Sequence, residues 1–112
     1  NVPFHREEYT AATITAYFNL DLHQIRGYGL GEDAERLLML LSLYKIRALL
    51  DGELRLRTAC DLSVVDDGNG IQADRPEGFL LPPRSELAAA VTGAIAACAD
   101  RMAGTTTVHY TT

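Results

Sequence analysis

Residues 32–51 form the pattern that most restricts the fold, because this helix-length segment is apolar on nearly every side. Glu32, Asp33 and Glu35 fall in its first turn, where the helix dipole favours anions, and Gly52 follows it as a C′ residue. Its interior is an almost continuous apolar stretch, made of Leu37, Leu38, Met39, Leu40, Leu41, Leu43, Tyr44 and Ile46. A helix of this kind is buried on more than one side. We therefore expect it to need a partner, either from further sequence or from another subunit.

A second helix is predicted at residues 85–103. Pro82 and Pro83 precede it, Ser85 is its expected N-cap, and Gly104 follows it.

Three segments alternate between apolar and polar residues as half-buried β-strands do, at residues 8–22, 53–65 and 105–111. Residues 71–81 are ambiguous and include a candidate short strand at 78–81. Glycine-rich segments at residues 23–31 and 66–70 are expected as connections. We therefore predict an α+β fold over residues 1–112. It is a single ferredoxin-like domain, with a β-α-β-(β)-α-β antiparallel sheet and both helices on one face.

The composition is that of a globular protein rather than a disordered one. The 112 residues suit about one domain, with 47% hydrophobic and 22% charged residues. The net charge of −5 counts against a free nucleic-acid binder but is compatible with one locally basic face. No apolar run approaches the roughly 20 residues that span a bilayer, and no signal peptide is visible. We expect a cytoplasmic protein without membrane association, in which Cys60 and Cys98 are buried free thiols. Because the sequence opens without methionine, we also expect it to be a fragment of a longer chain.

The open face of the predicted sheet carries groups that suit single-stranded RNA. Aromatic rings and guanidinium planes stack on bases, and arginines contact phosphates. The residues expected on this face are Tyr17, Asn19, Arg55, Arg57 and His109. The alternative is a solvated face on which Arg57 and Asp61 form an exposed ion pair of little energetic value.

Other chemistry has weaker support in the sequence. The Gly27–Gly31 segment precedes a helix, but it matches no phosphate-binding motif and the acidic first turn would repel phosphate, so a structural loop is expected. The histidines and cysteines lack metal-ligand spacing, and we expect no metal and no cofactor. His23 or His5 is the candidate general base if the protein cleaves RNA.

Four strings in this sequence resemble the C-terminal part of the Cascade backbone subunit of type I-U (I-G) CRISPR systems, a member of the RAMP superfamily. They are FHREEYT at residues 4–10, FNLDL at 18–22, IRGYGL at 25–30 and LRLRTACDL at 54–62. The sequence departs from the RAMP family in two respects. Its glycines follow the first predicted strand rather than the last helix, and the full subunit of that family is much longer than 112 residues.

The resemblance implies a RAMP-type ferredoxin-like domain that binds CRISPR RNA without cleaving it, in a surveillance complex for prokaryotic antiviral defence. The implied partners are CRISPR RNA, other Cascade subunits and copies of the chain itself. Arg26 lies in one of the resembling strings and joins the candidate RNA contacts, among which Arg55 and Arg57 come first. The alternatives are a RAMP endoribonuclease that needs no metal, and an unrelated ferredoxin-like module for oligomerisation or ligand binding.

Overall fold

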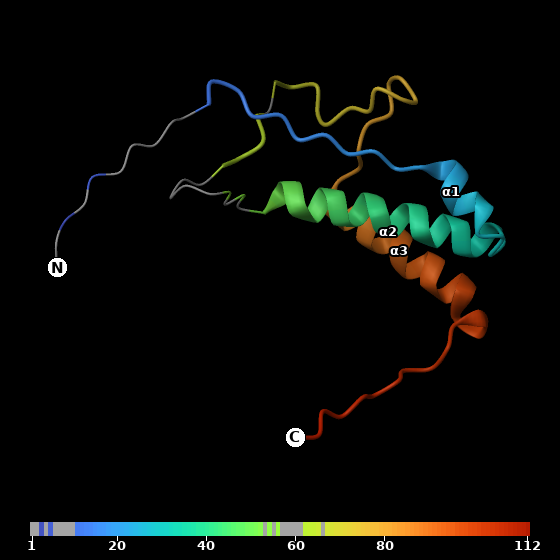
Figure 1. The fold of residues 1–112 in the computed structure, drawn as a ribbon. Helices are drawn as coiled ribbons and strands as arrows, with labels where there is room; N and C mark the ends of the chain where they lie inside the picture. Colours follow the sequence, from blue (N-terminus) through green and yellow to red (C-terminus); the bar gives the residue numbers. More distant parts are fainter. Residues whose placement is uncertain are drawn as a thin grey trace.

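Helices form the regular structure of this protein in its computed structural model, which describes residues 3, 5, 11–52, 54, 56, 62–65 and 67–112. They are α1 (Leu22–Gly27), α2 (Glu32–Asp51), α3 (Arg84–Cys98) and the short 3-10 helix η1 (Ala99–Arg101). Helices α2 and α3 pack against each other, and α1 lies at the N-terminal end of α2 (Figure 1).

The predicted ferredoxin-like sheet is wrong for the part of the chain that the structure describes. Two isolated antiparallel bridges are the β-structure found there, Leu54 with Leu62 and Gln72 with Leu80. The first bridge joins two residues of the strand predicted at 53–65, and the second joins the candidate strand at 78–81 to Gln72 in the ambiguous segment before it, so neither bridge links two different predicted strands. Residues 11–20 and 105–112 contain no helix or strand and make no backbone hydrogen bond to another described segment, so the half-buried strands predicted there do not form. A strand needs a neighbour to form a ladder, and these two segments lie on opposite sides of the helices (Figure 1).

The prediction of a helix at residues 32–51 is confirmed by α2, which has these bounds and carries its acidic residues in the first turn. Gly52 ends the helix with a φ of −81° and a ψ of 170°, so it is extended rather than left-handed. The second predicted helix is shifted, because α3 begins at Arg84 after Pro83 and ends at Cys98, with η1 continuing to Arg101. Ser85 therefore lies inside the first turn and is not the N-cap.

The connection predicted at residues 23–31 contains a helix that was not expected. Asp21 caps α1, because its Oδ1 accepts a hydrogen bond of 3.0 Å from the backbone N–H of Gln24. Ile25 is buried, so this side chain packs the short helix against the rest of the protein. Gly31 then takes a φ of +90° immediately before α2, a backbone conformation open to glycine.

The core is small and is supplied mainly by α3. Its buried residues are Leu87, Val91, Ala94 and Cys98, which repeat at helical spacing on one face, and Ile25 of α1 joins them. Helix α2 has no buried residue, so the predicted burial on more than one side is not met within this chain. The radius of gyration is 19.5 Å, against about 13 Å for a compact chain of this length. Much apolar surface therefore stays in contact with solvent.

Candidate interaction surface

Helix α2 presents an apolar surface that this chain covers only in part. Its residues from 37 to 44 are all half-buried, and Leu49 keeps 51% of its surface exposed. Long apolar helices that their own chain covers only in part are typical of proteins that pack against a partner.

A groove lies beside the C-terminal half of α2. It has a volume of about 420 Å³ and is lined by Arg47, Gly70, Ile71, Leu80, Leu81, Pro82, Pro83 and Glu86. A second hollow of about 290 Å³ shares three of these residues and adds Leu50, Asp51, Val64 and Val65. The walls are therefore largely aliphatic.

Arg47 is a charged residue that lines both hollows. Its Nε lies 3.0 Å from Oδ1 of Asp51 as an ion pair, although the angle does not meet the geometry of a hydrogen bond. Glu86 lines the same groove. Because two carboxylates accompany one guanidinium, the groove does not select anions, and an apolar side chain is the better fit.

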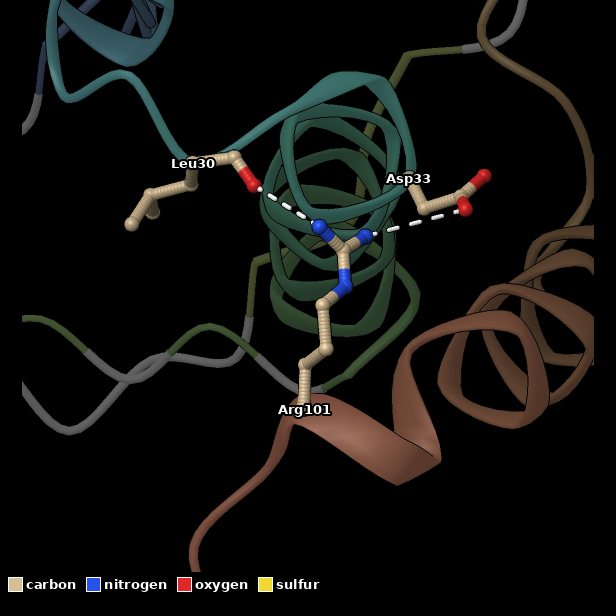
Figure 2. Close-up of polar contacts among 3 residues, drawn as sticks. All are labelled: Leu30, Asp33 and Arg101. Carbon is tan, nitrogen blue, oxygen red and sulfur yellow. Dashed lines mark hydrogen bonds and ion pairs between the residues drawn. The ribbon is translucent and has the colours of Figure 1, made fainter.

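The C-terminal end of the helical pair is tied to the start of α2 by Arg101 (Figure 2). Its Nη1 donates to the carbonyl oxygen of Leu30 at 3.3 Å, and its Nη2 lies 3.7 Å from Oδ2 of Asp33. A Cβ built on Gly31 would lie 3.1 Å from Nη1. The guanidinium therefore lies against the glycine-containing turn, where a carbonyl oxygen and a carboxylate of this chain contact it.

Two extended arms complete the surface. The N-terminal arm (residues 11–20) exposes 57% of Ile14 and 77% of Tyr17, and the C-terminal arm (residues 105–112) exposes 86% of Val108 and 90% of Tyr110. Large apolar side chains this exposed on two unpaired segments are candidates for contact with another polypeptide.

The structure does not bring the predicted RNA-binding residues together. Tyr17 and Asn19 are exposed on the N-terminal arm, Arg26 is exposed in the last turn of α1, and His109 is exposed on the C-terminal arm. The two arms leave on opposite sides of α2 and α3 (Figure 1). Arg55 and Arg57, the first candidates, lie outside the described residues, as does the proposed pair of Arg57 with Asp61.

Arg47 and Arg101 were not predicted as functional or structural contacts. The Arg47–Asp51 pair has the i,i+4 spacing of a helical ion pair, so the sequence held a signal for it. The contact of Arg101 with Leu30 spans 71 residues, and no local pattern indicates it.

No group of three or more potential metal-binding side chains occurs among the residues that the structure describes. Cys98 is buried with a free thiol, as predicted, whereas Cys60 lies outside the described part. No helix within the described ranges is long and apolar enough to cross a membrane.

Comparison with known proteins places the chain in no family. No family model matches the sequence, and no curated protein matches it significantly.

Proposed function

We propose that this protein is a non-catalytic subunit of a larger assembly, in which other chains cover the surface that it leaves exposed. The observation that carries the proposal is α2, a 20-residue helix with apolar side chains on nearly every side and no buried residue. The groove beside Arg47 and the two arms add apolar surface to the same subunit. Burial of apolar area is the main favourable term in association, so this surface favours partners over isolation.

We further propose that the assembly is a type I-U (I-G) Cascade complex and that the chain binds CRISPR RNA in its backbone. This part of the proposal depends on the four resembling sequence strings. It receives no support from the fold, because the ferredoxin-like sheet that the resemblance implies is wrong for the described residues. Of the proposed RNA contacts, Asn19 on the N-terminal arm, Arg26 on α1, Arg55 and Arg57 lie in the resembling strings, whereas Tyr17 on the N-terminal arm and His109 on the C-terminal arm lie outside them.

The test is filter binding of single-stranded RNA to the full-length protein at low and high salt, with and without partner subunits. The Arg55→Ala/Arg57→Ala protein is compared with an Arg75→Ala/Arg84→Ala control, which loses the same charge from two exposed positions. We expect salt-sensitive binding that the first pair weakens and the control pair leaves unchanged. If both double variants weaken RNA binding equally, the RNA is attracted by the overall positive charge and not by a site at Arg55 and Arg57.

The two parts of the proposal fail separately. If no RNA binds at low salt even with partner subunits, the RNA-binding part is refuted and the assembly part stands. If the protein stays monomeric alone and in every mixture with partner subunits, the assembly part is refuted.

Catalysis of RNA cleavage is the alternative that the sequence leaves open, with His23 or His5 as base. Both histidines are exposed in the structure, and no observation on the described residues favours either as a positioned base. We therefore propose no catalytic role.

A further inference from the structure

The two arms have backbone groups that are ready to form a β-ladder. Residues 11–20 and 105–112 contain no helix or strand and run outstretched (Figure 1), and within the described chain none of their N–H or C=O groups takes part in a backbone hydrogen bond. Extended segments with free backbone groups add readily to one another as strands.

The side chains of both arms suit such pairing. Neither arm contains proline, glycine, lysine, arginine, aspartate or glutamate, and both are rich in β-branched and aromatic residues. Natural edge strands that must stay unpaired usually carry lysine or proline as protection. These arms lack that protection, and a short uncharged segment of high β-propensity is typical of strands that pair between chains.

The arms of one molecule are not placed to pair with each other. In Figure 1 the N-terminal arm leads into α1 on one side of the helices, and the C-terminal arm runs away from η1 on the other. Each molecule therefore offers both halves of a two-stranded ladder at separate places. Matching them requires a second molecule.

We infer that the C-terminal arm of one copy adds as a β-strand beside the N-terminal arm of a second copy. The alternation of the two arms fits this pairing. On the N-terminal arm, Ile14 and Phe18 fall on the face opposite Tyr17 and are less exposed (57% and 40%) than Tyr17 (77%), so their face is the more covered of the two. An added strand with Val108 and Tyr110 on that same face extends the apolar side of the ladder.

The same register brings together residues that lie apart in a single copy. With Val108 and Tyr110 facing inward, His109 lies on the outer face, which Tyr17 and Asn19 of the second copy share. The RNA-binding face proposed above is then formed between copies. This last consequence rests on the proposed function, whereas the pairing of the arms does not.

The test is amide hydrogen exchange of the full-length protein without RNA, over a wide range of protein concentrations, with molar mass from light scattering. We expect the amides of both arms to become protected as concentration rises, by roughly tenfold when about nine-tenths of the copies are paired. The molar mass rises in parallel. Protection that does not change with concentration, or that is absent at every concentration, would overturn the inference.

Proline variants identify which segments pair, because proline cannot donate a ladder hydrogen bond. Val108→Pro and Ile14→Pro should each abolish the concentration-dependent protection of both arms. Ala103→Pro is the matched control, since it removes an N–H just before the C-terminal arm and should change nothing. Far-ultraviolet circular dichroism confirms that the helices persist. If Val108→Pro abolishes protection and Ile14→Pro leaves it intact, the N-terminal arm is not the partner and the inference fails.

This experiment separates the two proposals. Pairing of the arms without RNA binding refutes the RNA-binding part of the proposed function alone. RNA binding by a protein whose arms stay unprotected refutes the inference alone.

Discussion

Replacing Gly31 by alanine tests whether the turn between α1 and α2 depends on a backbone conformation that glycine alone tolerates. Gly31 has a φ of +90° and a ψ of 163°, and its carbonyl oxygen accepts the first hydrogen bond of α2, from the N–H of Glu35 at 3.0 Å. A non-glycine residue held in this region costs about 1–3 kcal/mol. We therefore expect Gly31→Ala to lower the free energy of unfolding by about that amount.

The new methyl group would also meet Arg101, but this adds little. A Cβ added at Gly31 would lie 3.1 Å from Nη1 of Arg101, which is tight, yet the guanidinium is the far end of a flexible side chain that is 49% exposed. It can move at the cost of a weak surface contact. Because backbone strain dominates, the loss should persist when Gly31→Ala is combined with Arg101→Ala. If the double variant regains the lost stability relative to Arg101→Ala alone, steric conflict is the cause instead.

The measurement is urea unfolding followed by circular dichroism of the helices. Gly27→Ala is the matched control, because Gly27 lies in α1, has an ordinary φ and would place its Cβ with nothing within 4 Å. Alanine favours helix over glycine by up to about 1 kcal/mol, so this variant should be unchanged or more stable. A Gly31→Ala protein as stable as the Gly27→Ala control would refute the reasoning.

Three further outcomes follow from the packing and charges. Leu87→Ala should cost about 2–5 kcal/mol, because Leu87 is 2% exposed, whereas Leu49→Ala should cost less than about half of that, because Leu49 is 51% exposed. Urea midpoints compare the two, and equal losses would contradict the placement of the core on α3. Arg101→Ala should cost at most about 1 kcal/mol, with the difference from wild type shrinking in high salt, since the ion pair is half-exposed. The pKa of Asp67 is lowered mainly by the hydrogen bond from the backbone N–H of Asn69, so the turn is stabilised above the ordinary pKa of aspartate. That stabilisation is lost as pH falls through the lowered pKa, and a carboxyl titration by NMR at the ordinary pKa would disprove it.

The candidate site could be predicted from the sequence only where its contacts are local. The apolar stretch at residues 37–44 already indicated a helix in need of a partner, and its half-exposed surface is the centre of the proposed assembly role. The i,i+4 spacing of Arg47 and Asp51 likewise indicated their ion pair. The groove beside Arg47 could not be foreseen, because it is formed by α2 together with segments near residues 70 and 80. The sequence predicted that Tyr17, Asn19 and His109 share one face of a sheet. The described part of the chain forms no such sheet, so a single copy does not bring these three residues together.

The sequence by itself determined the two long helices of this protein, α2 and α3, but not the short α1. The bounds of α2 follow from its apolar content, its acidic first turn and the glycines that flank it, and the buried face of α3 follows from the spacing of Leu87, Val91 and Cys98. Helical hydrogen bonds join residues four apart, so local sequence suffices to form them. Only the tertiary structure decided whether the alternating segments become strands, because each ladder hydrogen bond needs a partner that can be distant in sequence. Residues 11–20 and 105–112 have the pattern of strands, but the helices separate them, and within one chain they remain arms.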